Sequence, residues 1–274
     1  MTTTTSAFTV TPLAITPLGG TLGARVDGVR LADGFDQALV DRLQDALDEH
    51  LVIYLPGQGD VTSAQQLAFA GLWGEIAVHP YVPSIEGYPG IMRIYDPNEL
   101  TTVWHEDTTH MARPPLASIL LAREIPSRGG DTMWANEYVA YERLSEGLQS
   151  TLDGLDAVHE GTTMAGEQGL THEAVTTEHP VVVRHHRTGR KALFVNANYT
   201  TRFVGWTAEE SEPLLRYLYA QASRPEITWR HNWTVGDLLI WDNIATQHAA
   251  VGDAAPGEPR TLHRVTIGGT APSR

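Results

Sequence analysis

The residues best suited to chemistry in this chain are His105 and Asp107, two positions apart, and His248, far along the sequence. Two imidazoles and one carboxylate are a set that holds an Fe(II) ion on one face and leaves the opposite positions open. If residues 105–107 lie on a strand, His105 and Asp107 point to the same face while Glu106 faces away. The pattern therefore predicts Asp107 as the ligand and Glu106 as a bystander, with His248 supplied by the end of a distant strand.

Two arginines follow His248 in the sequence and suit the binding of an acid. A guanidinium forms two parallel hydrogen bonds with a carboxylate, so Arg260 can clamp an acid cosubstrate. Arg264 comes four residues later, and on a strand this spacing places both side chains on the same face, where both can point into a barrel. Together with the two histidines and Asp107, these arginines are typical of an oxygenase that uses an organic acid.

Each of these motifs also has a plainer interpretation. His105 and Asp107 can form an ordinary hydrogen-bonded pair at the surface, and Arg264 can pair with an internal carboxylate. Imidazole and carboxylate also suit zinc, so a Zn(II) hydrolase is one alternative. A catalytically silent barrel that only binds organic acids is another.

Hydrophobic periodicity predicts mainly β structure with flanking helices. Helices are expected over residues 35–50, 62–73, 138–155 and 207–222. Capping boxes at Thr62 and Thr207 begin two of them. Short strands are expected over residues 51–55, 91–95, 116–122, 131–135, 181–185, 193–196, 228–232, 237–241 and 261–268. Many short strands with interleaved helices are typical of a β-sandwich or distorted barrel buttressed by helices.

The composition predicts a single globular domain. The chain has 274 residues, of which 42% are hydrophobic and 19% charged, so it is too apolar for a disordered protein. Barrels and sandwiches reach this length as one domain, and no linker separates the motifs. We therefore expect one domain over residues 1–274, with residues 1–17 as a flexible N-terminal segment.

The charge and the cysteine content exclude several classes of function. A net charge of −14 opposes binding to nucleic acid or to an anionic membrane. The absence of Cys excludes a disulfide framework, a thiolate metal site and a cysteine nucleophile. The N-terminus lacks the features of a signal peptide, and no apolar run is long enough to span a bilayer. We expect a cytoplasmic protein, and the sequence leaves a homo-oligomer open.

Eight short motifs occur in an order that points to a known family. They are Trp104-His105-Glu106-Asp107, Arg113-Pro114-Pro115, Gly129-Gly130-Asp131-Thr132, His179-Pro180-Val181-Val182, Leu193-Phe194-Val195-Asn196, Trp241-Asp242-Asn243, Thr246-Gln247-His248 and His263-Arg264. From about Leu18 to Gly269 the chain closely resembles the taurine dioxygenase and 2,4-dichlorophenoxyacetate dioxygenase family of Fe(II)/2-oxoglutarate enzymes.

The resemblance implies a fold, two cofactors and a set of residue roles. The fold is a double-stranded β-helix core, also described as a jelly roll or cupin-like core, and the cofactors are Fe(II) and 2-oxoglutarate. The implied iron ligands are His105, Asp107 and His248. Thr132 and Arg260 match the positions that hold the distal carboxylate of 2-oxoglutarate. Arg264 and His79 match positions that bind the substrate in relatives that oxidise sulfonates.

Several pocket positions depart from the taurine enzyme. Thr101 and Val82 stand where that enzyme has Asn and Tyr, and His110 and Tyr199 stand where it has aromatic residues. Residues 160–178, which often form an active-site lid, are short and polar beside the longer insertion of many relatives. These departures argue against taurine itself. They leave a small anionic organic substrate, such as a sulfonate, a sulfate ester, an aryloxyalkanoate or an amino-acid derivative.

The resemblance implies that this substrate is oxidised at a C–H bond by O2, most simply by hydroxylation, with succinate and CO2 as further products. Retention of Asp107 argues against halogenation, because family halogenases lose this carboxylate to make room for chloride. A biosynthetic oxidation of the same family, such as desaturation or ring formation, needs the same iron site and stays open. The zinc hydrolase and the organic-acid-binding protein remain the less favoured alternatives.

Overall fold

The computed structural model describes residues 13–78, 83–96, 101–161 and 175–274. A large sheet with the strand order β1-β2-β3-β14-β6-β16-β4 forms its centre, and β5 also pairs with β16. All pairs in this sheet are antiparallel except β2 with β3. The strands are β1 Ala14–Pro17, β2 Ala24–Asp27, β3 Val52–Leu55, β4 Ile76–Ala77, β5 Ile91–Asp96, β6 Ala117–Glu124, β14 Leu238–Asp242 and β16 Arg260–Ile267.

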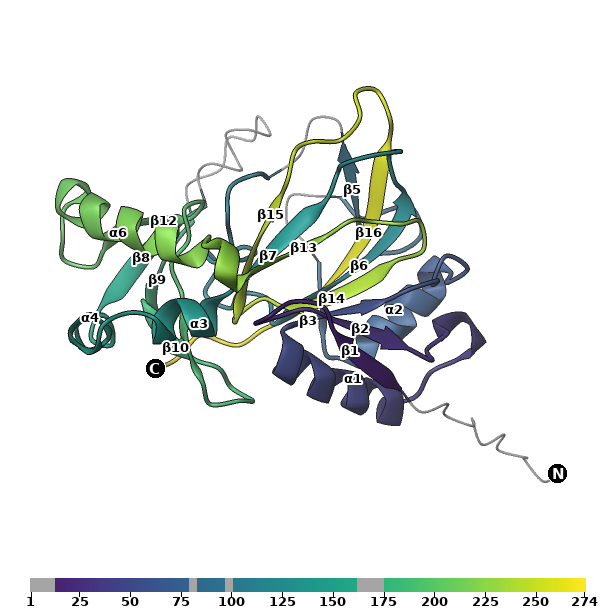
Figure 1. Ribbon diagram of the computed structural model, residues 1–274, viewed down its shortest axis with the longest axis horizontal. Coiled ribbons are helices and arrows are strands. Elements are labelled where there is room, and N and C mark those ends of the chain that lie inside the picture. Colours follow the sequence, from purple (N-terminus) through teal and green to yellow (C-terminus); the bar gives the residue numbers. More distant parts are fainter. Residues whose placement is uncertain (1–12, 79–82, 97–100, 162–174) are drawn as a thin grey trace.

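A second antiparallel sheet, in the order β13-β7-β15, lies beside the large one (Figure 1). Its strands are β7 Thr132–Asn136, β13 Thr228–His231 and β15 Thr246–Ala250. Buried side chains from both sheets share one core, in which Trp134 of β7 meets Leu120 of β6 and Trp241 of β14. This shared core fixes β15, and with it His248, against the large sheet.

Two helices cover the other face of the large sheet (Figure 1). These are α1, Gln37–His50, and α2, Ser63–Gly71. Because successive side chains on a strand point to opposite faces, Ile119 and Leu121 of β6 pack toward these helices while Leu120 packs toward the second sheet. The expected capping box of α2 is confirmed, since Thr62 and Gln65 bond each other's backbone N–H groups.

A third region joins two small sheets to three helices, on the left of Figure 1. Its strands have the orders β12-β8-β9 and β10-β11, and buried residues of α3, β8, β10, β11, β12 and α6 form its core. The elements are α3 Glu137–Glu142, α4 Glu146–Leu152, β8 Asp156–Glu160, β9 Thr176–Pro180, β10 Val182–Arg184, β11 Lys191–Leu193, β12 Thr200–Phe203 and α6 Ala208–Ala222. Short 3-10 helices occupy residues 31–33 and 225–227.

The structure confirms the expected mainly β architecture with flanking helices, but several details differ. The single helix expected over residues 138–155 is two helices, because the hydroxyl of Ser145 accepts a hydrogen bond from Leu148 N–H and starts α4 anew. The strand expected over residues 193–196 lies earlier, at β11. Strands β4, β8, β9, β12 and β15 were not expected from periodicity.

The end of the N-terminal segment, where the structure describes it, differs from the expectation. Residues 14–17 belong to the stretch predicted to be flexible, yet they form β1, which pairs with β2 in register over all four residues. Backbone hydrogen bonding orders this strand although its side chains are exposed. Within the described part of the chain, no helix is both long and apolar enough to cross a membrane.

Candidate metal centre

His105 and His248 lie next to each other through one isolated antiparallel bridge. The N–H of His105 donates to the carbonyl of His248 at 3.1 Å, and the N–H of His248 donates to the carbonyl of His105 at 2.8 Å. The expectation that residues 105–107 form a strand is therefore wrong. The bridge ends at His105 and the chain turns from Asp107 onward, with Thr108 at a left-handed φ of 47°. A turn, rather than strand alternation, aims Asp107 at the histidines.

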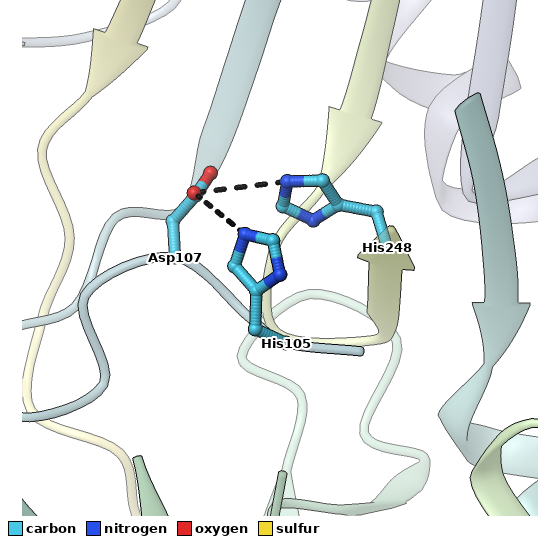
Figure 2. Close-up of side chains that lie close together, drawn as sticks. All are labelled: His105, Asp107 and His248. Atoms are coloured by element: carbon cyan, nitrogen blue, oxygen red, sulfur yellow. Dashed lines mark ion pairs between the residues drawn. The ribbon is translucent and has the colours of Figure 1, made fainter. Parts of the chain in front are cut away.

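The three predicted ligands converge, as Figure 2 shows. Oδ1 of Asp107 lies 3.8 Å from Nε2 of His105 and 3.7 Å from Nε2 of His248, and the three ligand atoms all lie within 4.8 Å of one another. Metal–donor bonds of about 2.1 Å place two donors of one ion roughly 3 to 4 Å apart. The donor types and this spacing fit a divalent metal held on one face.

Hydrogen bonding and burial prepare the imidazoles for a metal. Nδ1 of His105 lies 2.8 Å from the carbonyl of Val103, and donation to that carbonyl leaves Nε2 as the free lone pair. Burial lowers the pKa of His105 and of His248. Both rings are thereby kept in the neutral form that binds a metal.

Three residues hold Asp107 in place and keep it ionised. Oδ1 of Asn243 accepts the backbone N–H of Asp107 at 2.8 Å, and the hydroxyl of Ser118 donates to Oδ2 at 3.2 Å. Nη2 of Arg264 lies 2.5 Å from the same Oδ2. Burial acts to raise the pKa of Asp107, but the charge and the hydrogen bond of Arg264 outweigh it and hold this pKa below its ordinary value.

Glu106 stands outside the metal cluster found in the described residues, but it is no solvent-facing bystander. Its side chain is fully buried and accepts a hydrogen bond from Nδ2 of Asn196 at 2.5 Å. Burial raises the pKa of Glu106 to about 8. Glu137, also fully buried, has its pKa raised by burial and by Glu106. A buried polar layer thus lies behind the ligands, where the sequence pattern indicated nothing.

The structure brings Arg260 and Thr132 together, as expected. Arg260 lies at the start of β16 and is buried, with its Nε donating to the carbonyl of Gly130 at 2.7 Å. Its Nη2 donates to the hydroxyl of Thr132 at 3.2 Å, and Nε1 of Trp233 donates to the same hydroxyl at 3.0 Å. These contacts fix the plane of the guanidinium, which is what two-point binding of a carboxylate requires.

The remaining predicted residues divide into three groups. The rings of His110 and Tyr199 pack with their centroids 5.0 Å apart and their planes tilted by 39°, and burial, followed by the charge of Asp107, raises the pKa of Tyr199. Thr101 accepts the N–H of Ala250 through its carbonyl at 3.0 Å, at the end of β15. His79, Val82 and most of the 160–178 segment lie outside the described residues.

A cavity opens beside Asp107 and continues the site. Arg264 and Thr108 line it at the triad, and Val78, Met111 and Pro115 add apolar surface. Sequence reasoning had named neither Met111 nor Ser118 for this site. The sequence does not mark Ser118 as a site residue, because a serine within an apolar strand such as β6 is common. Only its contact with Asp107 reveals its role.

The triad and the fold define a metal-dependent enzyme with a two-histidine, one-carboxylate centre, and comparison with known proteins identifies its family. Residues 14–266 match the family described as taurine catabolism dioxygenase TauD, TfdA family. The chain belongs to this family, which confirms the resemblance seen in the sequence. It is therefore a non-heme Fe(II)- and 2-oxoglutarate-dependent dioxygenase, and not the zinc hydrolase or silent binding protein given above as the less favoured alternatives.

Named relatives cover almost the whole chain. The chain is 36% identical to an alpha-ketoglutarate-dependent sulfate ester dioxygenase of Pseudomonas putida, over 95% of this chain and 91% of that protein. It is 36% identical to an alkylsulfatase of Acinetobacter baylyi, over 94% of this chain and 85% of that protein. A crystal structure of a taurine dioxygenase from Burkholderia xenovorans superposes with a TM-score of 0.84 at 36% identity, covering 95% of this chain and 90% of the other.

Proposed function

We propose that this enzyme hydroxylates a C–H bond of a small anionic organic substrate, and that the substrate is a sulfate ester or a related sulfonate. The observation that carries the proposal is the position of Arg264. Its guanidinium lines the cavity and also touches Asp107 of the triad. An anionic group held there brings the neighbouring carbon next to the metal. The similarity to a sulfate ester dioxygenase and an alkylsulfatase supports this substrate class.

We assign the metal to His105, Asp107 and His248. Two neutral imidazoles and one carboxylate bring a single negative charge to a divalent ion and occupy one face of it. When bound, Fe(II) and 2-oxoglutarate supply the oxidising chemistry, in which O2 is consumed and succinate and CO2 are formed. The protein contributes the orientation of the ligands and the exclusion of water, since all three ligand side chains are buried.

The distal carboxylate of 2-oxoglutarate is assigned to Arg260 and Thr132. The carbonyl of Gly130 and the hydroxyl of Thr132 hold the buried guanidinium of Arg260 in one plane, and a guanidinium fixed in this way suits two parallel hydrogen bonds to a carboxylate. Arg260 and Arg264 lie on the same strand four residues apart. One cation is thereby assigned to the cosubstrate and the other to the substrate.

Arg264 would position the substrate for a defined outcome. If its anion is a sulfate ester, the carbon attacked carries the ester oxygen, and a hydroxylated carbon of this kind collapses to a carbonyl and releases sulfate. A sulfonate would release sulfite in the same way. We assign His110, Tyr199, Thr101 and His79 to the surrounding substrate pocket, in which the rings of His110 and Tyr199 pack against each other.

We propose that the chain forms a single domain over residues 1–274 with a double-stranded β-helix core. Two facing sheets make up this core, namely β13-β7-β15 and the part of the large sheet around β14-β6-β16. The supporting observations are the shared core between these sheets and the superposition on a taurine dioxygenase. The ligand residue His248 lies on β15, on one side of this core, and Arg260 and Arg264 lie on β16, on the other.

An anaerobic titration tests the cofactor assignment first. Fe(II)-loaded protein titrated with 2-oxoglutarate should develop a visible metal-to-ligand charge-transfer band, and His105→Ala should not. Succinate release is then measured with octyl sulfate, an alkyl sulfonate and an aryloxy acid. Succinate with octyl sulfate or the sulfonate, together with sulfate or sulfite, supports the proposed substrate class. A charge-transfer band with no turnover of either would sink that class while leaving the cofactor assignment intact.

A further inference from the structure

The cavity beside the triad contains a second arginine, Arg113, that the proposed mechanism does not use. Its other walls are mainly apolar and include Val78, Met111 and Pro115. Arg113 is exposed, whereas the side chain of Arg264 is only 12% exposed. The two guanidinium groups therefore differ in depth, with Arg264 inside and Arg113 toward the solvent.

Strand β16 shows how the cavity is oriented. Arg264, Thr266 and Gly268 all line it, and residues two apart on a strand point to the same face. Arg264 marks the metal end, because it touches Asp107. Four residues of extended chain cover roughly 13 Å, so Gly268 marks an end that lies well away from the metal.

Arg113 belongs to that outer end. The chain after it runs beside the end of β16, since the N–H of Leu116 donates to the carbonyl of Ile267 at 3.0 Å. The carbonyl of Pro114 lies so close to Gly269 that a Cβ there would come within 1.8 Å of it. The cavity thus has one arginine beside the metal ligand and another near the far end of the β16 face.

The two arginines also differ in how their charge is compensated. Arg264 is paired with Asp107. Arg113 has no hydrogen bond or ion pair with any residue in the described ranges. In a chain with a net charge of −14, a cation at the mouth of an apolar cavity, with no carboxylate partner among the described residues, is a favourable place for an anion.

We propose that Arg113 is a second anion-binding residue, and that the enzyme prefers a substrate with an anionic group at each end of an apolar chain. This inference rests on the proposed function, because it takes the first anion to bind at Arg264. The apolar walls of the cavity contact the carbon chain of the substrate between its two anionic ends. Arg113 binds the outer anion by charge-assisted hydrogen bonds.

Calorimetric titration of the Fe(II)- and 2-oxoglutarate-loaded enzyme without O2 tests the inference with two probes. One is octyl sulfate, and the other is the same ester with a carboxylate on its last carbon. The native enzyme should bind the carboxylated ester more tightly. Arg113→Ala should raise the dissociation constant of that ester about tenfold, equivalent to about 1.4 kcal/mol. It should change the dissociation constant of octyl sulfate by less than about twofold. Arg113→Lys should keep part of the preference.

The matched control is Arg42→Ala, which removes the same charge from an exposed position on α1, outside the cavity lining. It should change neither affinity. Equal weakening of both probes by Arg113→Ala would mean general electrostatic attraction and overturn the second site, as would no weakening at all. A native enzyme that binds octyl sulfate but gains nothing from the carboxylate overturns only this inference. A native enzyme that binds neither ester overturns the proposed substrate class as well.

Discussion

Asp107 divides its two carboxylate oxygens between the metal site and Arg264. Oδ1 faces Nε2 of both histidines, at 3.8 and 3.7 Å, whereas Oδ2 lies 2.5 Å from Nη2 of Arg264 and 3.2 Å from the hydroxyl of Ser118. With Oδ2 occupied, Asp107 has one oxygen left for a metal. The guanidinium of Arg264 is therefore both a partner of the ligand and a wall of the cavity.

Replacement of Arg264 should impair substrate binding far more than cosubstrate binding. In Arg264→Ala, the substrate anion loses its charge-assisted partner, and we expect the substrate KM to rise at least about tenfold, while the 2-oxoglutarate KM stays within about twofold. Steady-state kinetics at saturating Fe(II), with octyl sulfate varied and then 2-oxoglutarate varied, measure both constants. Equal increases in the two KM values would show that Arg264 has no dedicated role toward the substrate.

Replacement of Arg260 should give the opposite pattern. Arg260→Ala removes the buried guanidinium that the carbonyl of Gly130 and the hydroxyl of Thr132 orient. We expect the 2-oxoglutarate KM to rise about a hundredfold, as for loss of a buried charge-assisted pair worth roughly 3 kcal/mol. Because Lys lacks the planar fork, Arg260→Lys should recover only part of this loss. An unchanged dissociation constant for 2-oxoglutarate in the anaerobic titration would refute the assignment.

The ligand set could be predicted from the sequence because it depends on residue types and their order. The way in which the ligands converge could not. Strand alternation predicted that His105 and Asp107 point the same way, but a single bridge and a turn bring them together, with Thr108 in a left-handed conformation. Such a conformation in a non-glycine residue is imposed by the surrounding structure, and local sequence patterns carry no record of it.

Contacts between residues far apart in the chain also could not be predicted from the sequence. Arg260 and Thr132 were paired by the family resemblance alone, since 128 positions separate them. Ser118 gave no signal, and Asn196 occurred only as part of a family motif with no role assigned to it, because the importance of both comes from the buried carboxylates Asp107 and Glu106 that they contact. Periodicity predicted the helices and most strands with a clear apolar pattern. Strand β15 is short and begins with the polar residues Thr246 and Gln247, so it has no apolar alternation to detect.

Asn243 should prove essential for metal affinity although it contacts no metal. Its Oδ1 accepts the N–H of Asp107 at 2.8 Å, and its Nδ2 donates to the carbonyl of Pro115 at 3.1 Å. Loss of such a supporting contact typically weakens metal binding about 10- to 100-fold, and we expect this of Asn243→Ala. Fe(II) titration under anaerobic conditions measures the effect. Asn232→Ala is the control, because it removes an exposed asparagine that bonds Asp131 instead; equal losses in both variants would contradict the role.

His159 should make the protein less stable as the pH falls below the ordinary pKa of histidine. Its side chain is fully buried, and burial lowers its pKa from 6.5 to about 3, with smaller contributions from His179 and His110. The unfolded chain therefore binds a proton below pH 6.5 that the folded chain does not bind until about pH 3, so stability rises with pH across this window.

His159→Phe keeps an aromatic ring at this position and removes the group that titrates. The hydroxyl of Thr109 retains Nδ2 of Asn196 as a partner at 3.2 Å. Between pH 7.5 and pH 5, the native protein should lose about 1 to 2 kcal/mol more unfolding free energy than the variant. Urea denaturation of both proteins without metal at the two pH values measures the difference. Identical losses would show that His159 is protonated in the folded protein, and that the cluster it forms with His179 and Phe194 admits a charge.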